Sequence, residues 1–558
     1  MQVISILRNW SHPRRWLVLC GGLILLLGLT FFWQQTRTDY RHPVVGTSVT
    51  ASPTNAFSWL KIAGASVGDQ GMEITPIDRR IVTLGSASYQ ANPPYNTASY
   101  FTTSGDYRMT AKFNTESSFS LRLYASLPII YDEWRAEPAS IGVSLEQGNL
   151  RVNLWDGSGS EPVDSLQLTP DVPVVQQFSI DHIDNRFILY INNEEPIMLD
   201  DRGILREGKL WLGLDANQSW TLADISITSL NGSDVVLHEV DLTDTTLTAG
   251  LMTGARKQVG AAVALEPLLM DKGYRSALYS NFSLLVPENA MKPQFLQPRH
   301  GVFVFDDADQ LVKVAVSQGM AVHGHTLVFS EANPQWMTES TTTERQTIMV
   351  DHIAQVMGHY KGKVASWDVV NEPLADEGGL RQNIWLEAMG QDYIAVALRA
   401  ARAADPDAKI FINEYGLEAD GERWQTFLGL IDKLRAAGVP LDGVGFQSHI
   451  YETADEVDGS VLVNHMQQLA ERGLAARISE LDVHGEDVDQ QASQYETVAG
   501  ACLKSSSCQS ITTWGITDKY GSTTESQAYP LSLGDDLLWD ETLKPKPAYR
   551  RLEVLLKS

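Results

Sequence analysis

The C-terminal part of the chain, from about residue 259 onward, alternates between two hydrophobic patterns. Short runs of apolar, often β-branched residues are typical of buried parallel strands. They cover residues 260–264, 282–286, 321–328, 364–370, 409–412, 443–446, 476–481 and 511–516. Amphipathic stretches with helical spacing lie between them, at residues 308–318, 343–359, 393–404, 424–437, 461–472 and 490–503. This alternation predicts a (β/α)8 TIM barrel, which we place at residues 250–558.

A doubly wound open sheet is the alternative arrangement of the same strands and helices. It explains less, because polar residues follow nearly every apolar run. Such residues converge best when all the strands end at one mouth of a barrel.

Residues 57–240 carry a different pattern, in which short alternating runs are separated by turn residues. Clear examples are residues 119–124, 150–154 and 186–191. This spacing predicts an antiparallel, jelly-roll-like β-sandwich. The segment 178–227 resembles concanavalin-like jelly rolls in its pattern. That resemblance implies an accessory carbohydrate-binding role, although a spacer or structural module is an equally good reading.

The N-terminus contains one strongly apolar stretch, from Trp16 to Trp33. As a helix of about 18 residues it spans roughly 27 Å, close to the thickness of a hydrocarbon core. Basic residues precede it, which favours a single-pass anchor with its N-terminus inside and the rest of the chain outside the cytoplasm. We expect a stub and transmembrane anchor at residues 1–35 and a Ser/Thr/Pro-containing linker at 36–56. A cleaved signal peptide, which would give a secreted protein, is the alternative, but no Ala-x-Ala-like site follows the stretch.

The charge and cysteine content narrow the function classes. The chain has 43 Lys and Arg against 69 Asp and Glu, a formal net charge of −26, which disfavours binding to nucleic acid. Of the three cysteines, Cys502 and Cys508 enclose five residues and could form a small disulfide in an exported protein. There is no CxxC motif and no His/Cys cluster with ligand spacing, so we expect neither a metal nor another cofactor. We expect a monomer.

Two glutamates stand out within the barrel pattern. Glu372 ends the apolar run 367–372, and Glu480 lies at the polar switch of 478–483. Carboxylates at the ends of two buried strands can face each other across the mouth of one barrel. A pair of carboxylates is what cleavage of a glycosidic bond requires, one as proton donor and one as nucleophile or base. The sequence therefore predicts a glycoside hydrolase.

Seven motifs in the barrel region extend this prediction. They lie at residues 287–292, 323–328, 367–372, 413–415, 447–449, 479–482 and 513–518. In their residues and their order they resemble glycoside hydrolase family 10, which consists mostly of endo-β-1,4-xylanases with a (β/α)8 barrel. The resemblance covers residues 259–556. It implies a retaining enzyme that cleaves xylan, a membrane-tethered one if the anchor is retained.

The resemblance also implies roles for individual residues. Glu372 would be the acid/base, Glu480 the nucleophile, and Asn371 the partner of the sugar 2-hydroxyl. His449 would bridge Glu480 and Asp482. The residues that the resemblance assigns to substrate binding are Glu288, Asn289, Lys292, His325, Tyr415, Gln447 and Trp514. Cys502 and Cys508 match a disulfide that is common in the family.

Two places depart from the family pattern. Phe329 and Ser330 stand where the family usually has Trp and His, and residues 519–524 lack the Trp that often follows the eighth strand. Both changes affect the side of the cleft that holds the non-reducing end of the substrate. Two alternatives therefore remain: the same mechanism on another β-linked polysaccharide, or a catalytically weak, membrane-anchored glycan-binding or sensing protein.

Overall fold

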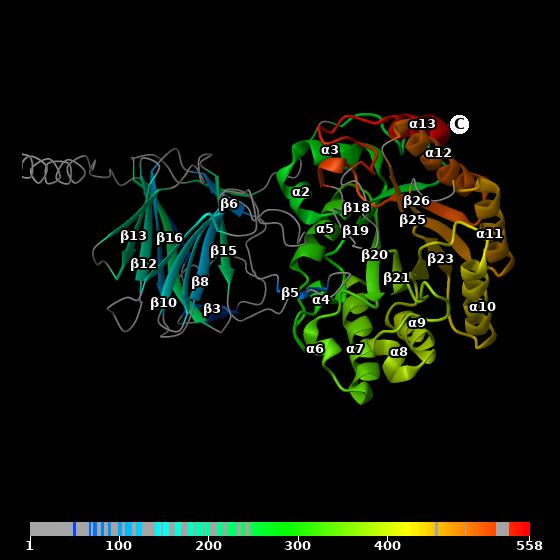
Figure 1. Cartoon of the computed structure of the whole chain (residues 1–558), viewed down its shortest axis with the longest axis horizontal. Helices are drawn as coiled ribbons and strands as arrows, with labels where there is room; N and C mark the ends of the chain where they lie inside the picture. Colours follow the sequence, from blue (N-terminus) through cyan, green and yellow to red (C-terminus); the bar gives the residue numbers. More distant parts are fainter. Residues whose placement is uncertain are drawn as a thin grey trace, which may run out of the picture.

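The computed structural model of the chain describes residues 245, 247–451, 456–485, 487–520 and 535–557. Before residue 245 it describes mainly the strands given below (Figure 1). The predicted anchor at 16–33 lies outside the described residues. Among the helices that are described, none combines the length and the apolar character that a bilayer crossing needs.

Eight parallel strands form the centre of the C-terminal half. They are β18 (Gln258–Val263), β19 (Leu284–Pro287), β20 (Ala321–Val328), β21 (Ser366–Asn371), β22 (Lys409–Glu414), β23 (Gly443–Phe446), β25 (Ala475–His484) and β26 (Cys508–Thr513). Each pairs with the next of these eight strands in chain order, and β26 pairs with β18. The short strand β24 (His449–Tyr451), which follows β23 in the chain, pairs with the end of β25. The sheet therefore closes on itself, which confirms the predicted (β/α)8 barrel.

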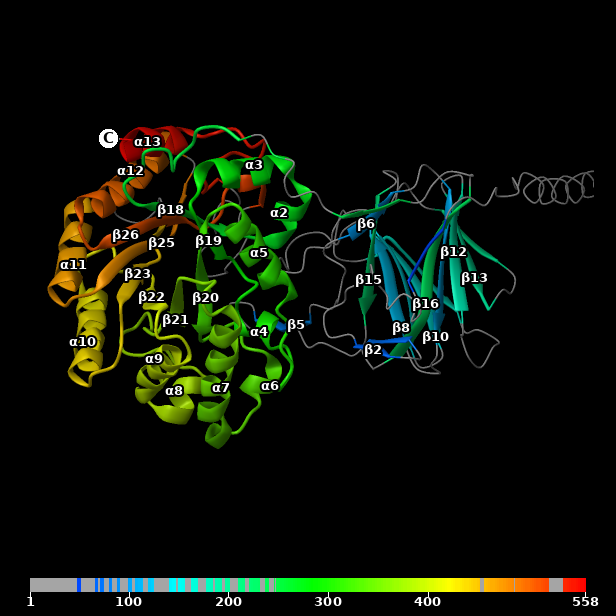
Figure 2. The ribbon, with the colours of Figure 1, turned by 180° about the vertical axis from the view of Figure 1, so that it is seen from behind.

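Helices cover the outside of this barrel (Figures 1 and 2). The six predicted ones are α5 (Asp306–Ser317), α7 (Thr342–Tyr360), α9 (Asp392–Ala404), α10 (Glu422–Ala436), α11 (Gly459–Glu471) and α12 (Val488–Lys504). The helical pattern did not identify several further helices: α2 (Leu265–Met270), α3 (Lys272–Asn281), α4 (Pro293–Leu296), α6 (Gln335–Thr338), α8 (Ile384–Met389) and α13 (Pro547–Lys557). Most of these are too short to show a clear period. The start of α3 is fixed by Asp271, whose carboxylate accepts hydrogen bonds from the backbone of Gly273 and Tyr274.

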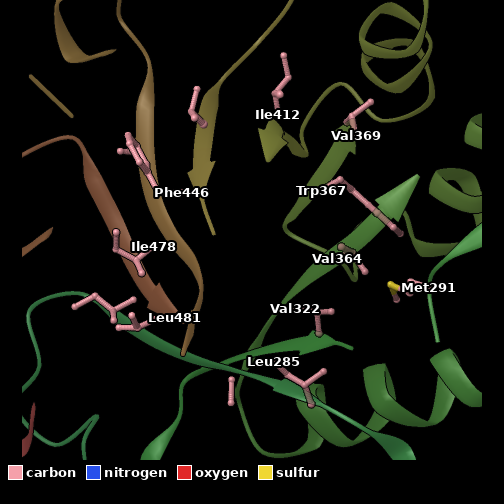
Figure 3. Packing of buried hydrophobic residues seen from close by; sticks show 14 of the residues in the cluster. Leu285, Met291, Val322, Val364, Trp367, Val369, Ile412, Phe446, Ile478 and Leu481 are labelled. Carbon is pink, nitrogen blue, oxygen red and sulfur yellow. The ribbon is translucent and has the colours of Figure 1, made fainter. Parts of the chain in front are cut away.

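The barrel core consists of side chains from the strands and from the inner faces of the helices. Figure 3 shows part of it, including Trp367, Ile412, Phe446 and Ile478, all of which are buried. The packing leaves no room for a side chain at residue 324, where a Cβ atom would lie 2.1 Å from Cε3 of Trp367. Gly324 thus lets two neighbouring strands carry a buried indole between them.

The N-terminal half contains two antiparallel sheets. The strand order is β14-β13-β12-β7-β16-β3-β2 in one, with β1 also paired to β16, and β11-β10-β9-β8-β15-β6-β17 in the other. The bounds of the first set are β1 (Ser48–Ala51), β2 (Ser66–Gly68), β3 (Gly71–Ile74), β7 (Tyr107–Phe113), β12 (Gln177–Ile183), β13 (Arg186–Ile191), β14 (Ile197–Asp200) and β16 (Trp220–Ser229). Those of the second are β6 (Ser99–Thr102), β8 (Phe119–Tyr124), β9 (Ser140–Glu146), β10 (Asn149–Trp155), β11 (Asp164–Leu168), β15 (Lys209–Asp215) and β17 (Val236–Glu239). A separate pair joins β4 (Arg80–Val82) and β5 (Ser88–Gln90).

These sheets fit the predicted β-sandwich in their strand pattern. Burial alternates along β7 and β10, as expected for strands with one face on a core. The first sheet also reaches into the range 36–56 that the sequence predicted as a linker, because β1 pairs with β16 there. The likeness to concanavalin-type jelly rolls stays a prediction.

Cys502, in α12, and Cys508, at the start of β26, form a disulfide, as predicted. Both residues are buried, and their sequence separation is 6. Closing so short a loop removes little entropy from the unfolded chain. We expect replacement of both cysteines by Ala to lower the free energy of unfolding of the barrel by about 2 kcal/mol, because the loop-entropy relation gives roughly that value for a loop of this size.

Urea titration followed by tryptophan fluorescence measures this change, and unfolding of the wild type under reducing conditions is its control. Activity at 25 °C should be retained, since neither sulfur lies in the mouth of the barrel. Equal midpoints for the oxidised wild type and the double variant would show that the crosslink contributes nothing.

Candidate active site

The two predicted glutamates lie at the same end of the barrel strands. Glu372 follows β21 directly, and its backbone N–H donates a 2.8 Å hydrogen bond to the carbonyl of Asn413 in β22. Its φ of 49° is in the left-handed region, which costs a non-glycine residue on the order of 1–3 kcal/mol. Glu480 does not end its strand, since β25 continues to His484 with register shifts around it. The pairing of β25 with β26 is therefore irregular at the part of this long strand that carries the Glu480 carboxylate.

A chain of hydrogen bonds links the two carboxylates through two asparagines. The Nδ2 of Asn371 donates to Oε1 of Glu372 at 3.3 Å. The Nδ2 of Asn413 donates to Oδ1 of Asn371 at 2.9 Å and also to Oε1 of Glu480. Strand pairing explains this contact, because Asn371 and Asn413 are register partners on β21 and β22. The structure therefore brings the two glutamates into one polar cluster.

Glu372 has an environment that favours its protonated form. Burial raises the pKa of Glu372, and the neighbouring charge of Glu480 raises it further. Three groups oppose this effect: Nε2 of Gln447 donates to Oε1 of Glu372 at 3.0 Å, the guanidinium of Arg381 lies 4.0 Å from Oε2, and the charge of His449 also acts to lower the pKa. The pKa is nevertheless raised above its ordinary value, as a proton donor near neutral pH requires.

Glu480 instead accepts hydrogen bonds and faces a histidine. Its side chain is only 5% exposed, and its Oε2 lies 3.2 Å from Nε2 of His449. The Nδ1 of His449 lies 2.8 Å from Oδ2 of Asp482. Burial acts to lower the pKa of His449, but Asp482 and Glu480 outweigh it and raise the pKa well above the ordinary value. A protonated His449 can donate a hydrogen bond to each of these two carboxylates.

Predicted substrate-binding residues that follow β19 or lie in β20 gather around the indole ring of Trp514, which follows β26. The Nζ of Lys292 donates to Oδ1 of Asn289 at 2.7 Å and lies 5.8 Å from the centre of the Trp514 ring. Asn289 donates in turn to Glu288. The His325 ring packs edge-on against Trp514 at 5.2 Å, and its Nδ1 lies 3.8 Å from Oε1 of Glu480. These residues thus lie near the Glu480 carboxylate of β25, and their role in substrate binding stays a prediction.

Tyr415 contacts the loop that follows β21. Its hydroxyl contacts Arg381 and Asp376, and the Arg423 guanidinium lies 4.1 Å above its ring. Arg423 is held by Glu414, at 2.8 Å. Because Arg381 also lies 4.0 Å from Oε2 of Glu372, it connects Tyr415 to the acid.

The structure shows what the two departures from the family pattern do locally. Phe329 is buried, and its carbonyl accepts a hydrogen bond from the indole N–H of Trp385 at 3.0 Å. Glu331 follows shortly after and has a pKa raised to about 7, by burial and by Glu372. At the second departure, residues 519–524, Lys519 and Tyr520 both contact the Asp271 carboxylate, at 2.7 and 2.9 Å. Residues 521–524 lie outside the described residues.

Three residues of the cluster were not predicted as site residues. Asn413 was seen only as part of a strand-end motif, and its position there is the signal that could have identified it. Asp368, buried in β21, holds His323 and His325 at 3.0 Å each. Arg381 comes from a loop, where no periodic pattern indicates which way a side chain points.

Two clusters in the described part of the chain have side chains of the kinds that bind metals. They are His325 with Asp368 and Glu480, and Asp482 with His484 and Asp536. In both clusters the imidazole nitrogens already face carboxylate oxygens at distances of 3.0–3.8 Å. Hydrogen bonding and charge pairing account for both arrangements.

Comparison with known proteins finds xylanases that are similar to the barrel region of this chain. The chain is 37% identical to endo-1,4-beta-xylanase A of Phanerodontia chrysosporium over 299 residues, which is 51% of this chain and 71% of that protein. It is 34% identical to endo-1,4-beta-xylanase B of Thermotoga neapolitana over 294 residues, 51% of this chain and 84% of that protein.

Solved structures match the same half of the chain. Xylanase 10B of Thermotoga petrophila RKU-1, in complex with xylobiose, superposes with a TM-score of 0.53 at 32% identity and covers 56% of this chain and 98% of that one. The sequence model of glycosyl hydrolase family 10 matches residues 249–554, which include the whole barrel and both glutamates. More than half of the chain is covered by that match, and the chain belongs to glycosyl hydrolase family 10.

Proposed function

We propose that this protein is a retaining endo-β-1,4-xylanase that cleaves xylan by double displacement. The observation that carries the proposal is the contrast between the two linked carboxylates. Glu372 has a raised pKa beside Gln447 and Arg381, whereas Glu480 accepts from Asn413 and faces the imidazole of His449. A carboxyl group with a raised pKa is suited to the acid role, and a neighbouring carboxylate that accepts hydrogen bonds from its surroundings is suited to the nucleophile role. The relatives named above are xylanases, which supports xylan as the substrate.

In the first step, Glu480 attacks the anomeric carbon while Glu372 protonates the departing glycosidic oxygen. The bond to the leaving chain breaks, and a glycosyl ester forms on Glu480. In the second step, Glu372, now ionised, takes a proton from water, whose oxygen attacks the same carbon and releases Glu480. Asn371 would form a hydrogen bond with the 2-hydroxyl of the sugar. This hydrogen bond strengthens as charge develops on the ring. Two inversions give net retention.

The raised pKa of Glu372 leads to a prediction about pH. Activity should fall on the basic side as Glu372 loses its proton in the free enzyme. Gln447 donates to the Glu372 carboxylate and so favours its ionised form. We expect Gln447→Met to raise the pKa of Glu372 further, which moves the basic limb of the kcat/KM profile to higher pH while weakening substrate binding. A limb that stays in place or moves to lower pH would show that this hydrogen bond does not control the acid.

The substrate itself is tested by comparing soluble wild-type protein on xylan, arabinoxylan, β-glucan and mannan. We expect reducing-sugar release to be highest on xylan. Preferential cleavage of another polysaccharide would favour the same mechanism on a different β-linked glycan, for which the Phe329 and Ser330 departures leave room. Binding without release would indicate a glycan-binding or sensing protein.

The arrangement of the whole chain belongs to the same proposal. The stretch 16–33 supports a membrane anchor with the catalytic domain outside the cytoplasm, and residues 57–240 support a β-sandwich module that binds glycan. Trp155, in β10, is buried and cannot stack on a sugar. Separation of membrane and soluble fractions, followed by protease treatment of intact cells, tests the anchor. Retention of the full chain on insoluble xylan, with and without residues 57–240, tests the module.

A further inference from the structure

A row of alternating carboxylates and imidazoles extends beyond the pair formed by Glu480 and His449. We propose that His484, which faces Asp536, is a positioning residue that fixes Asp482 against His449 and so keeps Glu480 correctly oriented. This inference rests on the proposed function, because it assigns His484 and Asp536 to the support of the nucleophile.

The distances along this row connect five side chains in sequence. Oε2 of Glu480 lies 3.2 Å from Nε2 of His449, and Nδ1 of His449 lies 2.8 Å from Oδ2 of Asp482. The other oxygen of Asp482, Oδ1, lies 3.2 Å from Nε2 of His484. Nδ1 of His484 lies 3.4 Å from Oδ2 of Asp536. Asp482 therefore has one oxygen toward each histidine, and each histidine has a carboxylate at both nitrogens.

This arrangement favours protonation of both rings, although burial and Asp482 raise the pKa of Asp536 to about 7 and so weaken its share of the effect on His484. An imidazole whose two nitrogens both face carboxylate oxygens can donate on both sides only as the imidazolium ion. Burial acts to lower the pKa of His484, but Asp482 and Asp536 outweigh it and raise the pKa. Burial also acts to raise the pKa of Asp482, yet His449 and His484 together lower it to about 2. Asp482 is thus held as an anion between two cations.

The backbone fixes the members of the row in place. His449 and Asp482 are register partners on β24 and β25, as are Tyr451 and His484, whose rings stack at 4.9 Å. The carbonyl of Asp536 accepts hydrogen bonds from the backbone N–H of Val483, at 3.2 Å, and from the hydroxyl of Tyr495, at 2.7 Å. The side chains of Asp482 and Asp536 are each 5% exposed, and that of His484 is 15% exposed. Such a buried set has little freedom to rearrange.

Other titratable groups surround His484, and their charges set the direction of its effect. The charged or titratable groups near it are His449 and Tyr451 on β24, Asp482 on β25, Glu456 and Asp487 around an adjoining cavity, Tyr495 on α12, and Asp518 and Asp536 in the C-terminal segments. Lys546 pairs with Asp518 at 2.8 Å, which leaves His449 and His484 as the two cations that face Asp482 directly. Removal of His484 should make Asp482 easier to protonate, and a protonated Asp482 holds His449 less firmly toward Glu480.

The test compares three single variants by their kcat/KM profiles against pH and by thermal unfolding. We expect His484→Gln to move the acidic limb to higher pH, so that kcat/KM falls roughly threefold or more on the acidic side, with kcat lowered more than KM is raised. Asp536→Asn should move the limb in the same direction by less. His359→Gln is the matched control, because His359 also stacks on a ring and pairs with a carboxylate, Asp309, far from the barrel mouth.

The outcomes separate the inference from the proposed function. An acidic limb that is unchanged in folded His484→Gln and Asp536→Asn would overturn the inference, as would a shift in His359→Gln of equal size. Loss of wild-type activity on adding a chelator, restored by a divalent cation, would assign this cluster to a metal and would also overturn it. Failure of the wild type to cleave any β-linked glycan would instead overturn the proposed function.

Discussion

Replacement of Glu480 by Gln is expected to lower kcat on xylan by a factor on the order of 10⁴ to 10⁶, comparable to the loss of a nucleophile in other covalent enzymes. Gln has the size of Glu, and its carbonyl oxygen can still accept the hydrogen bond from Asn413. It cannot form the glycosyl ester, so the double displacement is blocked at its first step. Reducing-sugar release under saturating xylan measures the effect, while the thermal unfolding midpoint shows whether the fold is retained.

Glu418→Gln is a suitable control for Glu480→Gln. Glu418 is a buried carboxyl whose pKa is raised by burial, and it accepts a hydrogen bond from Ser448 at 2.8 Å. An amide should replace it with most of the activity retained. If Glu480→Gln kept activity close to that of this control, the nucleophile would have been assigned to the wrong carboxylate.

Replacement of Glu372 by Gln is expected to lower kcat/KM on xylan by about 10² to 10⁴, the usual contribution of a general acid or base. The size of the loss should depend on the leaving group. A xyloside with an acidic phenol needs little protonation to depart, so its bond cleavage should be much less affected than that of xylan. The basic limb of the pH profile should also disappear for the variant, because Gln carries no proton to lose.

Parallel measurements on xylan and on the aryl xyloside test this assignment. Equal losses on both substrates would mean that residue 372 does not act by protonating the leaving group. Arg381→Lys provides a comparison, because a cation remains near Glu372 while the contact with the hydroxyl of Tyr415 changes. The pH profile of Arg381→Lys should retain its basic limb.

Much of the barrel could be predicted because its strands are buried on both faces. Such strands read as continuous apolar runs, and the runs at 321–328 and 443–446 coincide with β20 and β23. The eighth run was placed too late, since β26 ends at Thr513, before Trp514. Hydrophobicity continues past the strand there, because Ile516 is also buried in the core.

The contacts within the site were less predictable, because they join residues that are distant in sequence. Asn371 and Asn413 meet only because β21 and β22 are in register, and Arg381 reaches Glu372 from a loop. His484 and Asp536 are brought together by the C-terminal segment that packs on β25. The N-terminal sheets show the same limit. β1 pairs with β16, a strand far along the chain, and a local sequence pattern does not predict such a pairing.

The measurement that tests the central claim most directly is proton NMR of the first products released from xylo-oligosaccharides, recorded before the anomers equilibrate. Two glutamates that act as acid/base and nucleophile give two successive inversions at the anomeric carbon, so the β-anomer should form first. Initial appearance of the α-anomer would contradict the double displacement and with it the assignment of Glu480 as nucleophile.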